Sequence, residues 1–210
     1  QEELLSQPIW SQRVDGLLIP RNAPSPIRVG ADQLQKTLVK LKLGEAPVIE
    51  VDPNQEKIPE LAGKHIILLG VPESFALVRS VAAAARLEIT DQALNGDGFV
   101  IKPTTLQDKE LLLITSPAPR GVLYGAYELE ERTTHRGVPR IDDTFVPAVR
   151  YRSWAIHNFL DEPLGACGRW RFNISLTLTI PWPGTLVYNS FPELGGEQNR
   201  DAILANQQAL

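Results

Sequence analysis

The sequence is poor in sulfur: its 210 residues include one cysteine, Cys167, and no methionine. With a single cysteine, no disulfide can form within the chain. The first residue is Gln1 rather than methionine. A secreted precursor trimmed before Gln1 would explain this start, as would an engineered start. We therefore expect a secreted or periplasmic protein.

Long apolar runs and an excess of positive charge are also missing. The apolar runs, such as residues 66–69, are far shorter than the ~20 residues of a membrane-spanning helix. Lys and Arg number 21 against 25 Asp and Glu, which gives a formal net charge of −4. A surface that binds nucleic acid needs clustered basic residues to release counterions. We therefore expect neither a membrane nor a nucleic acid as a partner.

Motifs for cofactors and for common catalytic sites are absent from the sequence. The chain has no GxSxG nucleophile elbow, no GxxxxGK[ST] phosphate loop, no GxGxxG dinucleotide fingerprint and no HExxH zinc helix. Its three histidines, His65, His135 and His157, are far apart in the sequence, whereas a metal site needs about three ligands together. The sequence therefore predicts no cofactor and no metal.

What the sequence does contain is the pattern of an ordinary globular domain, with 43% hydrophobic and 22% charged residues. The apolar spacing predicts three helices, one over residues 32–43, one from Pro72 onward and one over 116–132. In the first of these, Asp32 is the predicted N-cap and Gly44 follows the end of the helix. The predicted strands are 17–20 at a sheet edge, 48–51, a central strand at 65–69, and a hairpin of 96–103 with 110–115. Two prolines within residues 22–26 predict a loop there. These elements predict the α+β class, a mixed sheet with helices packed against it, ending near residue 146.

The dipeptide Val146-Pro147 is the predicted domain boundary. Residues 149–157 and 175–180 predict two further strands after it. Residues 147–210 are far too few for a (β/α)8 barrel, which needs about 250 residues. We therefore predict an α+β domain over residues 1–146 and the beginning of a second domain over 147–210.

A family resemblance supports this division. The stretches GDGFVIKP, ELLLITSPAPRGVLYGAYELEE and VPAVRYRS resemble the small domain that precedes the catalytic barrel in several glycoside hydrolases, among them bacterial β-N-acetylhexosaminidases, chitobiases and α-glucuronidases. The resemblance covers residues 15–157, and its specific part is RGVLYG at 120–125. It implies that residues 1–146 are a non-catalytic domain with a zincin-type fold without a metal, and that residues 147–210 begin a truncated (β/α)8 catalytic domain. The whole would be the N-terminal part of an enzyme that hydrolyses O-glycosyl bonds in complex carbohydrate. The catalytic acid/base pair would lie beyond Leu210, so this chain alone would be inactive.

The RGVLYG motif also has a physical interpretation of its own. Gly121 and Gly125 are four residues apart, so they share one face of a helix and let that face approach a sheet closely. This arrangement costs about 1 kcal/mol of helix propensity at each glycine. Tyr124 can bury its ring, and Arg120 near the positive helix start needs a partner elsewhere. We therefore expect a packing or interface role for the motif rather than direct contact with sugar.

Candidate sugar contacts come from the beginning of the predicted barrel. Arg152, His157 and Asn158 lie on its first strand, and functional residues cluster at the carboxyl ends of barrel strands. Trp182 in PWPG follows the second strand and could stack on a pyranose ring, as could Trp170. The resemblance implies a carbohydrate substrate as the partner of the complete enzyme, with these residues in contact with the sugar, and it leaves a homo-oligomer open.

No residue of this chain is predicted to be catalytic. Asp161 and Glu162 resemble the adjacent Asp-Glu pair of the hexosaminidases, but they follow the first strand of the predicted barrel, whereas the family's pair follows the fourth. Cys167 has no histidine signature beside it. The alternative to an enzyme portion is a stand-alone carbohydrate-binding or protein-interaction module. An unrelated α+β scaffold is a third possibility, and a third helix whose glycines do not pack on a sheet would favour it.

Overall fold

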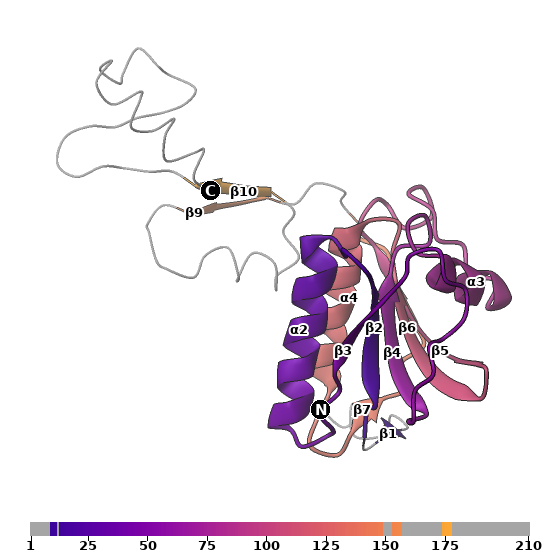
Figure 1. Ribbon diagram of the computed structural model, residues 1–210. Helices are drawn as coiled ribbons and strands as arrows, with labels where there is room; N and C mark the ends of the chain where they lie inside the picture. Colours follow the sequence, from indigo (N-terminus) through magenta and orange to yellow (C-terminus); the bar gives the residue numbers. More distant parts are fainter. Residues whose placement is uncertain (1–8, 12, 149–152, 157–173, 178–210) are drawn as a thin grey trace, which may run out of the picture. The chain divides into compact units, whose positions relative to one another are not determined.

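The computed structural model describes residues 9–11, 13–148, 153–156 and 174–177 (Figure 1). The chain divides into two compact units, Gln1–Arg150 and Tyr151–Leu210. The first unit is built on a six-stranded mixed sheet with the strand order β3-β2-β4-β6-β5-β8. Its strands are β2 (Gly16–Pro20), β3 (Val48–Val51), β4 (His65–Gly70), β5 (Phe99–Leu106), β6 (Lys109–Thr115) and β8 (Asp143–Phe145).

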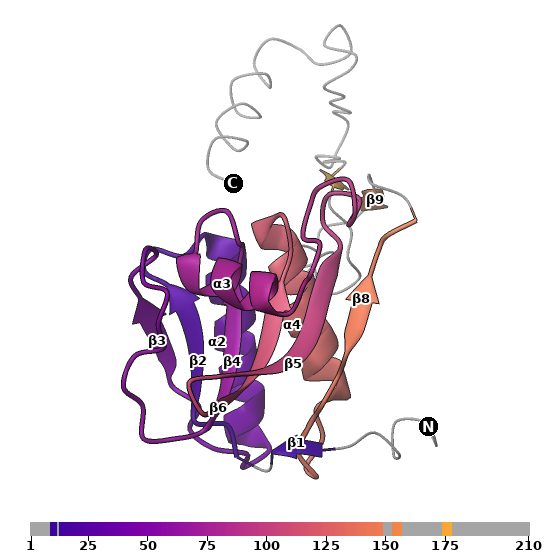
Figure 2. The same ribbon diagram turned by 90° about the vertical axis from the view of Figure 1, so that its right-hand side faces the viewer.

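In the described part of the chain, three helices cover the two faces of this sheet. Helices α2 (Ser25–Lys40) and α4 (Pro119–Arg132) lie side by side on one face, and α3 (Ala76–Ala84) lies on the other (Figures 1 and 2). Strands β3, β2, β4 and β6 run parallel, while β5 is antiparallel to both β6 and β8. Strand β1 (Ile9–Ser11) pairs with β7 (Val138–Pro139) outside this sheet.

Strand β4 shows why the domain has two hydrophobic cores. Successive side chains of a strand point to opposite faces, so Ile67 and Leu69 join the core under α2 and α4, whereas Ile66 and Leu68 join the core under α3. All four side chains are fully buried. The uninterrupted apolar run therefore belongs to a central strand that is covered on both sides, as predicted.

The predicted order of elements and the α+β class are confirmed. The hairpin forms between β5 and β6, with the two-residue turn Gln107-Asp108, and the third helix is α4. The sequence predicts helices against the sheet without deciding their faces, and the structure puts them on both. The zincin-type assignment stays a prediction.

One strand prediction is wrong: residues 17–20 do not form an edge strand. Strand β2 lies between β3 and β4, and all five of its residues are buried. Proline is tolerated there because it occupies the last position of the strand. The next donor along the chain, the Arg21 N–H, binds the Val51 carbonyl at 2.7 Å. The edge strand on this side of the sheet is β3, and β8 forms the opposite edge.

The boundaries of two helices also differ from the prediction. Helix α2 begins at Ser25, with proline in its first turn, so Asp32 lies inside the helix and is not its N-cap. Leu41 is the C-cap of this helix, and Lys42, with φ of +60°, takes the position predicted for Gly44. Helix α3 begins at Ala76, four residues after Pro72, which therefore lies in the preceding turn.

In the second unit the structure describes two short strands. Strand β9 (Ser153–Ile156) pairs in parallel with β10 (Ile174–Thr177). Each overlaps one of the two strands predicted there. The predicted boundary at residue 146 and the assignment of residues 147–210 to a barrel stay predictions.

Candidate functional site

The residues predicted to contact sugar lie outside the described part of the chain. Arg152, His157, Asn158 and Trp182 all belong to ranges whose structure is not described, as do Asp161, Glu162, Cys167 and Trp170. Their roles therefore stay predictions. Within the described residues, two features could carry function: the motif helix α4, and a polar network at the amino end of the parallel strands.

Helix α4 packs on the sheet through its glycines. A Cβ atom built on Gly125 would lie 2.6 Å from Cγ2 of Ile114 on β6 and 3.2 Å from the ring of Phe99 on β5. A Cβ on Gly121 would overlap the Ser116 hydroxyl and lie 2.8 Å from the Asp97 carbonyl oxygen. Neither position has room for a side chain. The predicted close approach of this helix to the sheet is confirmed.

The rest of the motif is also largely internal. Tyr124 is 1% exposed and is one of the largest fully buried side chains. Ser116, just before the helix, is buried, and its Oγ accepts the Ala118 N–H at 3.2 Å. Arg120 lies exposed in the first turn of α4. The motif is thus mainly a packing signature, which joins α4 to the β5–β6 hairpin.

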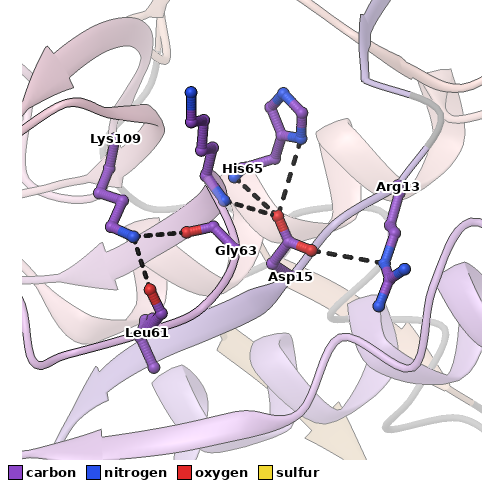
Figure 3. A network of polar contacts seen from close by, with 7 residues as sticks. Arg13, Asp15, Leu61, Gly63, His65 and Lys109 are labelled. Carbon is purple, nitrogen blue, oxygen red and sulfur yellow. Dashed lines mark hydrogen bonds and ion pairs between the residues drawn. The ribbon is translucent and has the colours of Figure 1, made fainter.

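The polar network is centred on Asp15, directly before β2 (Figure 3). Its Oδ2 accepts the backbone N–H groups of Lys64 at 2.8 Å and His65 at 3.0 Å. Its Oδ1 lies 3.4 Å from Nε of Arg13. The sheet creates this arrangement, because β2 and β4 are adjacent and Gly16 is in register with Ile66. Asp15 therefore ties the start of β4 to the start of β2.

Lys109 holds the same loop from the opposite side. Its Nζ donates to the carbonyl oxygens of Leu61 at 2.6 Å and Gly63 at 2.7 Å (Figure 3). Gln107, in the hairpin turn, adds a third attachment, since its Oε1 accepts the Ile58 N–H at 3.1 Å. Three side chains from two other segments thus fix the loop that connects β3 to β4.

A shallow, open cavity of about 470 Å³ lies between this loop and the hairpin turn. It is lined by Ile58, Pro59, Glu60, Leu61, Ala62, Gln107 and Lys109. Glu60 is exposed, whereas Lys109 is half-buried and committed to two carbonyl oxygens. The lining is mainly aliphatic and contains no aromatic ring on which a sugar could stack.

The polar network around Asp15 supports the fold and is not arranged for hydrolysis. Glycoside hydrolysis requires two carboxyl groups across the scissile bond, or one carboxyl group together with an acetamido group of the substrate. Asp15 instead accepts two backbone N–H groups and pairs with Arg13, so its oxygens are occupied by its own fold. In the described residues, no group of three or more His, Cys, Asp and Glu side chains could hold a metal ion. The prediction of a metal-free protein is not tested further.

Sequence reasoning missed Asp15, Lys109 and Gln107. Their only local signal is that a polar residue stands beside a buried strand or in a tight turn. Their partners are 46–50 residues away in the case of Asp15 and Lys109, so the strand order must be known before the contacts can be found.

The described ranges contain no helix with the length and apolarity needed to cross a bilayer.

The solved structures that match the chain include the following two. One, CpGH84D, aligns with a TM-score of 0.54 and 12% identity over 84% of this chain and 30% of its own. The other is described as a GH138 enzyme targeting pectin rhamnogalacturonan II, and it aligns with a TM-score of 0.39 and 17% identity over 67% of this chain and 16% of its own. The chain therefore spans less than a third of either protein. At such identities the likeness to CpGH84D shows a shared fold. The likeness to the GH138 enzyme supports no inference about this chain, because its TM-score is only 0.39.

Comparison by sequence gives the family. No curated protein matches the chain. A sequence model described as "Glycosyl hydrolase family 67 N-terminus" matches residues 12–129, which is more than half of the chain. The match begins next to the Asp15 network and ends in helix α4, so it includes both features described above. The chain belongs to the family of glycosyl hydrolase family 67 N-terminal domains.

Proposed function

We propose that this chain is the N-terminal accessory portion of a glycoside hydrolase and that its role is to brace the catalytic domain of that enzyme. The observation that carries the proposal is the family match over residues 12–129. The architecture is consistent with bracing, because the unit Gln1–Arg150 encloses hydrophobic cores on both faces of its own sheet. The polar residues of its network hold a loop in place and are not arranged for hydrolysis.

We also propose that residues 147–210 begin a (β/α)8 catalytic domain. The parallel pairing of β9 with β10 supports this, because every neighbouring pair of strands in such a barrel is parallel. In the complete enzyme, Arg152, His157 and Asn158 would contact the sugar and Trp182 would stack on it. The catalytic acid and base would be supplied by residues after Leu210.

The substrate in this proposal is a complex carbohydrate cleaved at an O-glycosyl bond. Specificities of the α-glucuronidase and β-N-acetylhexosaminidase types are both retained, because the resemblance in sequence extends to both. Secretion or export to the periplasm and assembly into a homo-oligomer remain further proposals. Cell fractionation and light scattering of the natural protein would test these two points.

An activity screen tests the enzyme proposal. The full-length gene product, the 210-residue chain and a full-length variant lacking residues 1–146 would be assayed on an aryl α-glucuronide and an aryl β-N-acetylglucosaminide. We expect the full-length protein to cleave one of them and the 210-residue chain to cleave neither. The variant without the accessory domain should lose thermal stability and activity together. A full-length protein that cleaves no aryl glycoside would contradict the proposal.

Point variants test the proposed sugar contacts. In the full-length enzyme, His157→Ala and Asn158→Ala should each lower kcat/KM by about tenfold or more, as expected for the loss of a substrate contact. His135→Ala is the matched control, because His135 is an exposed histidine in the accessory unit. Equal effects at His157 and His135 would remove His157 from the site.

The 210-residue chain also tests the alternative of a stand-alone carbohydrate-binding module. If that chain alone binds oligosaccharides and Trp182→Ala abolishes the binding, the alternative is favoured over the bracing role. The same titration with Trp154→Ala controls for a general effect of losing a tryptophan.

A further inference from the structure

The chain leaves the six-stranded sheet of the accessory unit through a segment that is held in place. Strand β8 ends at Phe145, and the next residues are Val146, Pro147 and Ala148. Val146 and Ala148 are exposed, but Pro147 between them is buried. A free linker would expose all three residues, so something in the unit covers Pro147.

The covering element is the turn before β5. The side-chain Nδ2 of Asn95 donates to the Pro147 carbonyl oxygen at 2.7 Å. Gly98 lies directly against the same segment, because a Cβ atom there would be 2.6 Å from the Phe145 carbonyl oxygen. The rings of Phe99 and Phe145 stack, with centroids 5.2 Å apart. The turn and the start of β5 thus hold the exit segment through a hydrogen bond, a close backbone contact and a ring stack.

The turn itself is well braced by local hydrogen bonds. The Leu94 N–H donates to the Thr90 carbonyl at 3.1 Å, the Gly96 N–H to the Asp91 carbonyl at 3.0 Å, and the Gly98 N–H to the Leu94 carbonyl at 2.9 Å. Asn95 has φ of +48°, a conformation that asparagine accepts more readily than most residues. The backbone therefore presents the Asn95 amide to Pro147 without needing the exit segment to hold it.

We propose that the turn at residues 90–98 is a clamp that fixes the direction in which the chain leaves the accessory unit. Asn95 and Gly98 are its positioning residues, and Pro147 is the residue it holds. The inference rests on the proposed bracing function, because a brace transmits force only through a stiff joint. A free tether of the same length would connect the unit to the catalytic domain without supporting that domain.

Proteolysis of the 210-residue chain tests the clamp without any substrate. Trypsin can cut after Arg150, three residues beyond Pro147, and it must draw the neighbouring backbone into its active site to do so. Asn95→Asp keeps the size of the side chain and its tolerance of positive φ, but it puts a carboxylate against a carbonyl oxygen. Asn95→Gly relieves any backbone strain and also removes the amide. Both variants should be cut after Arg150 about tenfold faster than the unaltered chain, as expected for the loss of one hydrogen bond.

Asn22→Asp is the matched control, because Asn22 is an exposed asparagine with φ of +59° just after β2. It should be cut at the unaltered rate. A nitroxide on Ala148→Cys, in a Cys167→Ser background, gives a second measurement: its motion should be slow in the unaltered chain and faster with Asn95→Asp. Urea unfolding of each variant separates opening of the joint from loss of the whole fold.

Two results would overturn the clamp. One is a cleavage rate after Arg150 that is the same for both Asn95 variants, Asn22→Asp and the unaltered chain. The other is a nitroxide at position 148 that already moves freely in the unaltered chain. Because no sugar enters these measurements, their failure leaves the glycosidase assays to decide the proposed function separately.

Discussion

Asp15 and His65 are joined at both backbone and side chain. The Asp15 N–H donates to the His65 carbonyl at 2.8 Å, and the Asp15 carboxylate accepts the His65 N–H at 3.0 Å. The same carboxylate oxygen lies 3.7 Å from Nδ1 of His65, a distance for an ion pair when the imidazole is protonated and too long for a hydrogen bond. The contact joins the starts of two adjacent central strands and fixes where the loop before β4 ends.

Replacing Asp15 by alanine should destabilise the domain. The backbone N–H groups of Lys64 and His65 would lose their acceptor, and the His65 group is partly buried. We expect the free energy of unfolding to fall by about 1–3 kcal/mol, measured by urea denaturation. Asp52→Ala is the control, because Asp52 accepts a single exposed N–H two residues along the chain. If both variants lose the same free energy of unfolding, the Asp15 network contributes no more to stability than the single exposed hydrogen bond of Asp52.

The sign of the change in free energy of unfolding caused by Gly125→Ala distinguishes packing from helix propensity. In an open helix position alanine would stabilise by about 1 kcal/mol. Here the added Cβ would lie 2.6 Å from Ile114, and overpacking typically costs about 1–3 kcal/mol. We expect a net loss of stability. We also expect the double variant with Ile114→Ala to lose less free energy of unfolding than the two single variants added together. A stabilised Gly125→Ala variant would show that α4 has more room than the structure gives it.

The hairpin turn offers a stabilising substitution. Gln107 and Asp108 have φ of +52° and +61°, the signs of a type I′ turn, in which glycine is favoured at the second position. Asp108→Gly should raise the free energy of unfolding by about 0.5–1 kcal/mol, whereas Asp108→Ala should lower it. Thermal unfolding of the two variants side by side measures the difference. The same sign for both would mean that the backbone conformation of this turn does not limit stability.

Lys109→Met should loosen the loop over residues 58–63. Methionine keeps most of the aliphatic stem but cannot donate to the carbonyl oxygens of Leu61 and Gly63. Hydrogen exchange in that loop should accelerate while exchange in β4 stays slow, because β4 is held by its ladders to β2 and β6. Lys102→Met, which removes an ion pair to Asp142 outside this loop, should leave the loop unchanged. Unaltered exchange at 58–63 would refute the attachment by Lys109.

Local patterns are sufficient for most of the element order. The apolar run at residues 66–69 predicts a doubly covered strand, and its alternate side chains do enter two cores. The glycines at 121 and 125 predict a helix in close contact with a sheet, and the space around both is filled. Such predictions succeed because burial restricts the size and polarity of each residue within the element itself.

Errors arise where a residue has two possible structural roles. Pro20 is typical of an edge strand, but at the final position of β2 its missing N–H is harmless and the strand lies inside the sheet. Pro24 and Pro26 predict a loop, although proline is also favoured in the first turn of a helix, where α2 begins. Only the neighbouring elements decide between the two roles.

The sequence by itself determined the class of the fold, the order of its main elements and the helix that carries the family motif, because these depend on periodicity and on residue size. Only the tertiary structure decided which strands are neighbours, which faces the helices cover, and how Asp15, Lys109 and Asn95 hold segments that are 46–52 residues away. Those contacts depend on strand order and register, which bring distant residues together without leaving any pattern near them in the chain.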